Sequence, residues 1–190
     1  LLLVANRHLP EKRKKREAIA RKYDLELPLE LTRQGYHSDE VHGRYVYAVK
    51  SDERNKLKTF LEKKMIETKI FNEPLACDAP VYQQYNTHPV PVARKMLDKS
   101  LIIPSHEKLS DEQINKIITP LEGIYLIIDH IRTLIFAISD GALPSNVGGG
   151  YNLRIMLRRI ISTMNRLSLK FDMDEMIDAQ IDYLKNTYPE

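Results

Sequence analysis

A glycine-rich stretch that leads into an arginine-bearing segment is the part of this sequence best suited to chemistry. Residues 140–159 read DGALPSNVGGGYNLRIMLRR, and four of the chain's seven glycines fall within residues 141–150. Backbone amides at the start of a helix, with guanidinium groups one turn further on, suit phosphate groups. Three functions are therefore open for this stretch: a nucleotide cradle, a nucleic-acid contact, or a flexible corner between two helices.

The residues around the glycines exclude two kinds of nucleotide site. A phosphate-binding loop of the Walker type needs Lys and then Ser or Thr directly after its glycines, but Tyr151, Asn152 and Leu153 follow here. A dinucleotide fingerprint needs a preceding strand and the spacing G-x-G-x-x-G, but a helix-like run precedes this stretch. The pattern therefore predicts a turn into a helix rather than a nucleotide cradle.

The segment after the glycines has the pattern of an amphipathic helix with a basic face. Arg154 and Arg158 are four residues apart and therefore share one face. The opposite face is apolar and consists of Leu153, Met156, Leu157 and Ile160. Two interpretations stay open for the basic face. It contacts phosphate groups, or it is an ordinary solvated surface, which the spacing alone favours.

The stretch DHIRTLIFAISDGALPSNVGGGYNLRIMLRR, with DYLKNTYPE further on, resembles the alanyl-tRNA synthetases, and GGGYNLR resembles their archaeal branch. The resemblance runs from about Thr119 to residue 190, and it implies the start of the helical domain that reads the tRNA acceptor stem. It also implies that Asn146 contacts the G·U wobble pair of alanine tRNA, since an amide offers a donor and an acceptor to a base edge. The tRNA-binding residues expected here are Asn146, Ser145, Asn152, Arg154, Arg158 and Arg159.

The region up to about residue 118 alternates helix and strand signals, which is typical of a small layered α/β domain. Ile19 and Tyr23 lie four residues apart in the first helical segment, and Ser51 and Ser110 stand where helix N-caps are expected. Helices are predicted over residues 11–27, 51–65, 91–100 and 109–118, and strands over 44–50, 66–71 and 101–105.

The region after residues 119–120 is predicted to be all helix. Its first helix carries apolar residues at 124, 128, 131, 135 and 138, and two further helices are predicted over 151–167 and 172–188. Asp129 and Arg132, three residues apart, are expected to pair on the helix surface. The predicted fold class is α+β, with a small α/β layered domain at about 1–118 and an all-helical segment at about 119–190.

The first region has a resemblance of its own. REAIARKYD, RYVYAVKSDERNKLKTFLEKKMIETKIF and PVARKMLDKSLIIPSHEKLSDEQINKII resemble, in order and spacing, the C-terminal small domain of the DegT/DnrJ/EryC1/StrS sugar aminotransferases. That family uses pyridoxal phosphate, and its Schiff-base lysine belongs to a large domain that has no counterpart here. Phe71 and Ala76 stand where the family has tyrosine and histidine, which argues against a retained sugar site.

Charge and cysteine content limit the remaining functions. Residues 1–118 hold 22 Lys and Arg against 17 Asp and Glu, a net charge of +5, whereas residues 119–190 hold 7 against 9, a net charge of −2. A nucleic-acid site in the second region must therefore rest on local placement. The single cysteine, Cys77, excludes an intrachain disulfide, so a cytoplasmic protein with no membrane span is expected. The histidines lack metal-ligand spacing, and no metal site is predicted.

Three functions therefore stay open for the chain. It is a fragment related to alanyl-tRNA synthetase that contacts a tRNA acceptor stem, part of a pyridoxal-phosphate aminotransferase, or an inactive fusion remnant. ATP and pyridoxal phosphate are implied by the two resemblances only, and neither is expected to be bound by this chain alone. We expect no catalysis by this chain alone, and we expect exposed apolar surface to favour a homo-oligomer.

Overall fold

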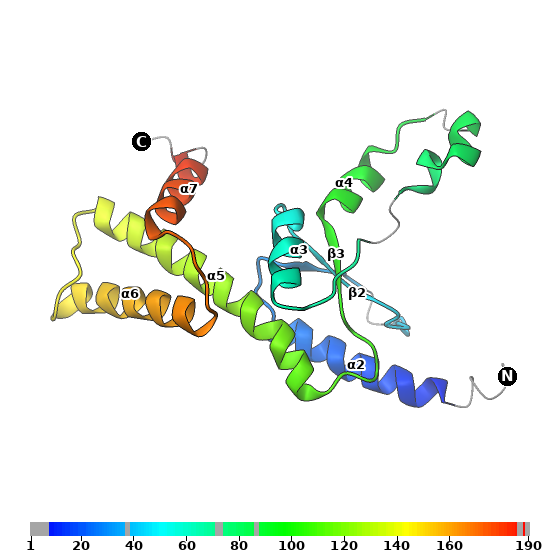
Figure 1. Ribbon diagram of the computed structural model, residues 1–190, viewed down its shortest axis with the longest axis horizontal. Helices are drawn as coiled ribbons and strands as arrows, with labels where there is room; N and C mark the ends of the chain where they lie inside the picture. Colours follow the sequence, from blue (N-terminus) through cyan, green and yellow to red (C-terminus); the bar gives the residue numbers. More distant parts are fainter. Residues whose placement is uncertain (1–7, 37–38, 71–73, 86–87, 186–187, 189–190) are drawn as a thin grey trace. The chain divides into compact units, whose positions relative to one another are not determined.

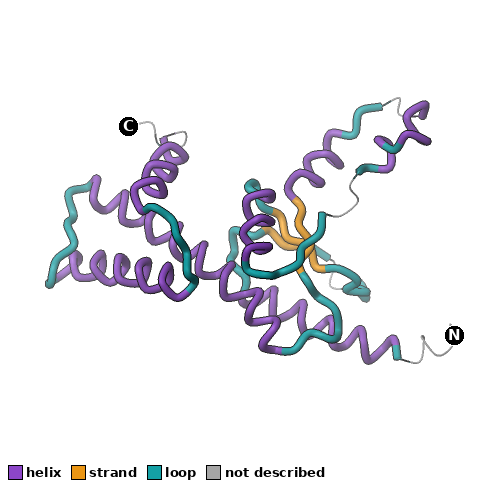
Figure 2. Tube along the Cα trace, in the orientation of Figure 1, coloured by secondary structure: helices purple, strands orange, loops and turns teal. Residues whose placement is uncertain are grey.

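The computed structural model describes residues 8–36, 39–70, 74–85, 88–185 and 188 of the 190-residue chain (Figure 1). The chain forms two compact units, unit 1 at Leu1–Ile118 and unit 2 at Thr119–Glu190. Unit 1 combines helices with an antiparallel sheet, whereas the described part of unit 2 has helices and loops (Figure 2). The fold class is therefore α+β, as the sequence predicts.

The sheet of unit 1 has three short strands in the order β1-β2-β3. These strands are β1 at Thr32–Arg33, β2 at Tyr47–Lys50 and β3 at Ser100–Ile103. Both pairings are antiparallel, with Tyr47 opposite Ile103 and Val49 opposite Leu101. Side chains alternate between the two faces of a strand, so these four residues share one face, and all four are buried.

Helix α2, Leu9–Glu26, packs its apolar side against the sheet residue Tyr47. Ile19 and Tyr23 are both buried, as their spacing predicts. The ring of Tyr23 meets the ring of Tyr47 edge-on, with 5.0 Å between centroids, and the Tyr23 hydroxyl donates a 2.7 Å hydrogen bond to the carbonyl of Pro104. Buried tyrosines in folded proteins commonly satisfy their hydroxyls in this way.

Helix α3, Arg54–Lys63, is shorter than predicted, and the strand predicted after it is wrong. Ser51 is not the N-cap, because the cap residue is Glu53 and carries no side-chain cap bond. After the helix, Met65 takes a left-handed conformation with φ 59°, and the amide of Ile66 donates back to the carbonyl of Leu61. This helix ending uses the first residue of the expected strand, and among its described residues only Lys69 pairs with β3. Phe71 lies outside the described residues.

The described part of residues 76–99, before β3, contributes little to the core. It contains the short 3₁₀ helices η1, Ala76–Asp78, and η2, Pro80–Tyr85, followed by α4, Pro91–Lys99, and none of the three buries a residue. Figures 1 and 2 show it standing away from the sheet and α2. Arg94 of α4 holds η1 through two hydrogen bonds, of 2.9 and 2.6 Å, to the carboxylate of Asp78.

Helix α5, Asp111–Ser139, begins at a reciprocal cap and continues further than the sequence predicts. The amide of Gln113 donates to Ser110 Oγ at 3.2 Å, and the amide of Ser110 donates to Gln113 Oε1 at 2.9 Å, which confirms Ser110 as the cap. The two helices predicted on either side of residues 119–120 are in fact one, because α5 runs through Pro120. A proline inside a helix removes one backbone hydrogen bond. The burial of Pro120 and Leu121 offsets part of that loss.

Unit 2 is built around α5, α6 at Gly148–Arg166 and α7 at Met173–Lys185. Its core joins five buried residues, namely Ile127, Ile131, Leu134, Leu153 and Ile160. Of the stripe predicted on α5, Ile131 is a core residue and Ile135 packs against the core, whereas Ile138 is 44% exposed. Helix α5 is apolar on several sides, so periodicity allowed more than one stripe, and packing against α6 selected the one that contains 127, 131 and 134.

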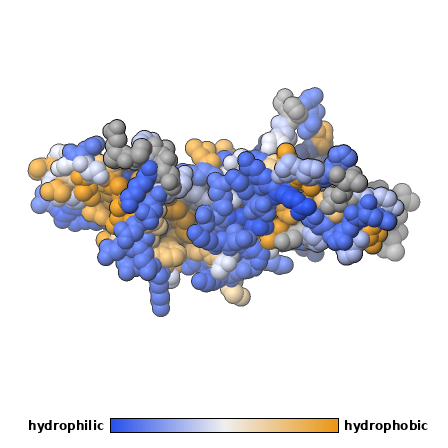
Figure 3. Space-filling model, turned by 90° about the horizontal axis from the view of Figure 1, so that it is seen from above, coloured by the Kyte–Doolittle hydropathy of each residue, from blue (hydrophilic) through white to orange (hydrophobic). Residues whose placement is uncertain are grey.

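Apolar residues also remain at the surface of the protein, as Figure 3 shows for one face. The large exposed residues include Val81, Tyr85, Val92, Leu143 and Val147. Within the described residues, none of the helices combines the length and the apolar composition that crossing a membrane requires.

Candidate nucleic-acid interface

The candidate site lies where the chain leaves α5 and enters α6. At the end of α5, the amide of Gly141 donates to the carbonyl of Ile138, and the amide of Ala142 donates to the carbonyl of Ala137, both at 2.9 Å. This pair of bonds is a Schellman ending, which needs a left-handed residue, and Gly141 supplies it with φ 86°. We call residues 142–147, between this turn and α6, the Asn146 loop.

The three consecutive glycines belong to the helix rather than to the loop. Helix α6 begins at Gly148, two residues after Asn146, whereas the sequence predicted its start at Tyr151. Gly148 has φ 58°, a conformation that is unfavourable for residues other than glycine. At this residue the chain turns from the loop into the helix. The N-cap residue is Val147, which has no side chain able to cap, so the helix start has no side-chain cap bond.

The predicted apolar face of α6 is buried in the core of unit 2. Leu153 and Ile160 are core residues, and Met156 and Leu157 pack against them. The opposite face is polar and accessible, since Asn152, Arg158 and Arg159 are exposed while Arg154 is half-buried. The amphipathic pattern is thereby confirmed as a structural feature of the helix.

The loop presents Asn146 to solvent and uses Ser145 for its own structure. Both residues are exposed. The Ser145 hydroxyl accepts a hydrogen bond from the amide of Val147 at 3.3 Å and donates one to the carbonyl of Val147 at 2.9 Å. In the part of the chain that the structure describes, the amide side chain of Asn146 forms no hydrogen bond. Of the two polar side chains in the loop, Asn146 is therefore the one available to a partner.

Charge is sorted between the helices of unit 2. Helix α6 carries Arg154, Arg158, Arg159 and Arg166 and contains no Asp or Glu. Helix α7 carries Asp174, Glu175, Asp178 and Asp182 against one lysine. The net charge of the region is negative, yet α6 itself is a purely basic surface. Positive charge in this region is therefore a matter of local placement on α6 rather than of bulk charge.

The pair expected between Asp129 and Arg132 does not form. Among the described residues no ion pair joins the two side chains, and Nε of Arg132 is buried without a hydrogen-bond partner. The carbonyl of Asp129 instead accepts a 3.0 Å hydrogen bond from the Thr133 hydroxyl. Spacing of three residues allows such a pair but does not fix the side-chain rotamers that would make it.

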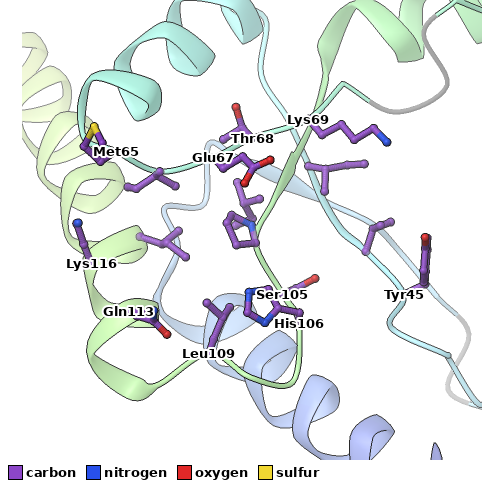
Figure 4. Close-up of a pocket in the computed structure, with 16 residues that line it drawn as sticks. Tyr45, Met65, Glu67, Thr68, Lys69, Ser105, His106, Leu109, Gln113 and Lys116 are labelled. Atoms are coloured by element: carbon purple, nitrogen blue, oxygen red, sulfur yellow. The ribbon is translucent and has the colours of Figure 1, made fainter. Parts of the chain in front are cut away.

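Unit 1 contains a separate hollow of about 440 Å³ between residues 65–69, the end of β3 and the start of α5. Figure 4 shows Glu67 on one side of it, Ser105 and His106 on another, and Gln113 and Lys116 along α5. Its lysines, Lys69 and Lys116, are exposed, whereas a Schiff-base lysine needs a desolvated setting that lowers its pKa. These residues do not fit a pyridoxal-phosphate site. Among the described residues, His, Cys, Asp and Glu also form no group suited to a metal ion.

Comparison with solved structures finds aminotransferases of similar fold. A DegT DnrJ EryC1 StrS aminotransferase from Brucella abortus matches with a TM-score of 0.60 and 24% identity, over 65% of this chain and 34% of that chain. The aminotransferase TlmJ from Streptoalloteichus hindustanus matches with a TM-score of 0.56 and 24% identity, over 63% of this chain and 33% of that chain. At this identity the likeness concerns the fold alone.

Comparison with curated proteins finds alanine–tRNA ligases. The ligase of Nitrosopumilus maritimus is 70% identical over 82 residues, and that of Cenarchaeum symbiosum is 61% identical over 82 residues. Each match covers 43% of this chain and 9% of the relative, so the chain spans less than a tenth of the length of these ligases.

The family model described as tRNA synthetases class II (A) matches residues 46–190. This match includes the Asn146 loop and α6, and it also extends into unit 1, well before the start at residue 119 that the sequence resemblance indicates. It spans more than half of the chain. The chain therefore belongs to the class II (A) tRNA synthetase family.

Proposed function

We propose that unit 2 binds the acceptor stem of a tRNA through the Asn146 loop and the exposed face of α6. One observation carries the proposal: the exposed Asn146 lies in the loop that leads into α6, a helix with four arginines and no acidic residue. The names of the alanine–tRNA ligases that the chain resembles agree with an RNA partner.

Each residue has a role that its chemistry supports. The Asn146 amide reads the G·U wobble pair from the minor groove, which in A-form RNA is wide and shallow enough to admit a loop. Arg158 and Arg159 face the phosphate groups, and Arg154 does so with its exposed part. Asn152 adds a further amide on the same exposed side.

This role is binding rather than catalysis. The proposed site offers amide, guanidinium and hydroxyl groups, and it holds no nucleophile paired with a general base. The ligase reaction of the relatives is not assigned to this chain, which spans only 9% of their length. The likeness of unit 1 to aminotransferases adds no activity, because it concerns the fold.

A pair of RNA hairpins tests the proposal. The two hairpins mimic an acceptor stem and differ only in carrying a G·U or a G·C pair at the recognition position. We expect the G·U hairpin to bind at least tenfold more tightly, which corresponds to about 1.4 kcal/mol. The Asn146→Ala variant should bind both hairpins equally. Equal binding of the two hairpins by the unmodified chain would remove Asn146 as a reader of the base pair.

A further inference from the structure

Ser145 forms three hydrogen bonds that close the Asn146 loop on itself and on α6. Its hydroxyl accepts from the amide of Val147 and donates to the carbonyl of the same residue, at 3.3 and 2.9 Å. Its amide donates to the carbonyl of Gly150, in the first turn of α6, at 2.9 Å. Ser145 therefore joins the two residues that flank Asn146 through its hydroxyl, and it joins the loop to α6 through its backbone amide.

Ser145 packs directly against Gly150. A Cβ added at Gly150 would lie closer than any real Cβ contact to the Ser145 hydroxyl and to the backbone carbonyl of Leu143, and 3.0 Å from Ser145 Cβ. Gly149 next to it has nothing within 4 Å of such a Cβ. Two adjacent glycines thus have different requirements: Gly150 must be glycine for the loop to close on α6, whereas Gly149 has free space.

We infer that Ser145 is a positioning residue for Asn146, seated on Gly150, and not itself a contact to the RNA. The inference rests on the proposed function, since it assigns how the base-reading amide is held. The Ser145 hydroxyl donates one hydrogen bond to Val147 and accepts one from it, and Asn146 lies between these two residues. The backbone on both sides of Asn146 is fixed before any partner arrives.

Such fixation matters because ordering a loop opposes binding. Holding one residue in a single backbone conformation costs free energy, and a loop ordered in the free protein does not add that cost to the binding step. Loss of the hydroxyl leaves residues 145–147 free to sample other conformations, in which the Asn146 amide no longer faces the same base pair. Ser145→Ala should therefore weaken binding of the G·U hairpin roughly tenfold and bring its preference over the G·C hairpin close to that of Asn146→Ala.

The experiment compares matched pairs of variants of the full 190-residue chain. Ser145→Ala is paired with Ser145→Thr, which keeps a hydroxyl, and with Ser162→Ala, which removes an exposed serine elsewhere on α6. Gly150→Ala is paired with Gly149→Ala. Two quantities are measured for each: affinity for the two hairpins, and amide hydrogen exchange of Ser145 and Val147 without RNA.

We expect Ser145→Ala and Gly150→Ala to speed exchange of both amides in the free protein and to lose preference for the G·U hairpin. Ser145→Thr, Ser162→Ala and Gly149→Ala should keep both properties. If Ser145→Ala weakens both hairpins equally and leaves exchange at Val147 unchanged, Ser145 is a direct contact and the inference is wrong. If Asn146→Ala alters the preference while Ser145→Ala does not, the positioning role fails and the proposed function stands. If neither alters it, the proposed function itself fails.

Discussion

Gly123 of α5 lies directly against the side chain of Leu167, the C-cap residue of α6. A Cβ added at Gly123 would overlap Leu167 Cδ1 and would lie 3.1 Å from Thr163 Cγ2. Leu167 and Thr163 are both buried, so neither can move away freely. This close approach of α5 and α6 holds the helix that carries the candidate site.

Gly123→Ala should therefore destabilise the protein. Alanine favours a helix over glycine by about 1 kcal/mol, but overpacking a buried contact costs about 1–3 kcal/mol. We expect a net loss of about 1 kcal/mol in the free energy of unfolding, measured by urea denaturation. The double variant Gly123→Ala, Leu167→Ala should show positive coupling, since the second change makes room for the first. A rise in stability for the single variant would contradict the packing described here.

Ser168→Gly should stabilise the protein. Ser168 follows α6 with φ 50°, and the amides of Ser168 and Leu169 donate to the carbonyls of Asn165 and Met164, the two bonds of a Schellman ending. A left-handed conformation costs a non-glycine residue about 1–2 kcal/mol, part of which is offset by the greater freedom of glycine in the unfolded chain. We expect a gain of about 0.5–1 kcal/mol in thermal or urea unfolding.

The control for this prediction is Ser162→Gly, an exposed serine inside α6. There glycine relieves no left-handed conformation and weakens the helix by about 0.5 kcal/mol. Met65→Gly provides a second test in unit 1, because Met65 ends α3 with φ 59° and is 84% exposed. If all three glycine variants lose stability, backbone strain at Ser168 and Met65 is not the controlling effect.

Stability should fall in acid partly through Glu17. The hydrogen bond from Arg44 Nε, at 2.9 Å, lowers the pKa of Glu17 below its usual 4.5. The unfolded chain therefore takes up this proton more readily than the folded chain. The stabilisation is complete above pH 4.5 and is lost as the pH falls through the lowered pKa of the folded state.

Glu17→Gln should remove this pH-dependent part. Arg44 is only 5% exposed and its Nη2 already lacks a hydrogen-bond partner among the described residues, so losing its carboxylate partner is costly. We expect a loss of about 1–3 kcal/mol at pH 7, and a smaller difference from the unmodified chain below pH 4.5. Unfolding curves recorded from about pH 3 to about pH 7 measure this difference in the free energy of unfolding. Glu26→Gln, an exposed change on the same helix, should leave the curves unaltered.

Arg158→Ala and Arg159→Ala should weaken RNA binding without changing the preference for the G·U hairpin. Both side chains are exposed on the basic face of α6, and phosphate contacts carry no sequence information. Each lost phosphate contact should also reduce the dependence of log Kd on log salt concentration by about 1. Arg13→Ala, an exposed arginine of α2, is the matched control. If the salt dependence stays the same in both α6 variants, their arginines do not face phosphates.

Local sequence signals were sufficient to predict several features of the fold. The reciprocal cap of Ser110 and Gln113, the buried pair Ile19 and Tyr23, and the apolar stripe of α6 all follow from spacing within one or two helical turns. Such features depend on neighbours in sequence, which a single sequence contains. The family was also recognisable, because the motif around Asn146 is long and has few gaps.

Other features depend on contacts between distant residues. Helix α5 continues through Pro120, and its buried stripe is the one that packs on α6, although the sequence favoured a break and a different stripe. Among the described residues, the predicted strand at 66–71 is reduced to a single bridge at Lys69. The left-handed conformation of Met65 turns the amide of Ile66 back to α3, so Ile66 does not begin a strand. Neither outcome has a local signal, since each is decided by which partner offers the better packing or hydrogen bond.

The candidate site shows the same division. The family resemblance of the sequence pointed to Asn146, and helical spacing placed Arg154 and Arg158 on one face of α6; their contact with RNA stays a prediction. Only the tertiary structure separated Ser145 from Asn146, and Gly150 from Gly149. That distinction depends on which atoms lie within a few ångströms once the loop folds back onto α6. Residue types alone do not contain those distances.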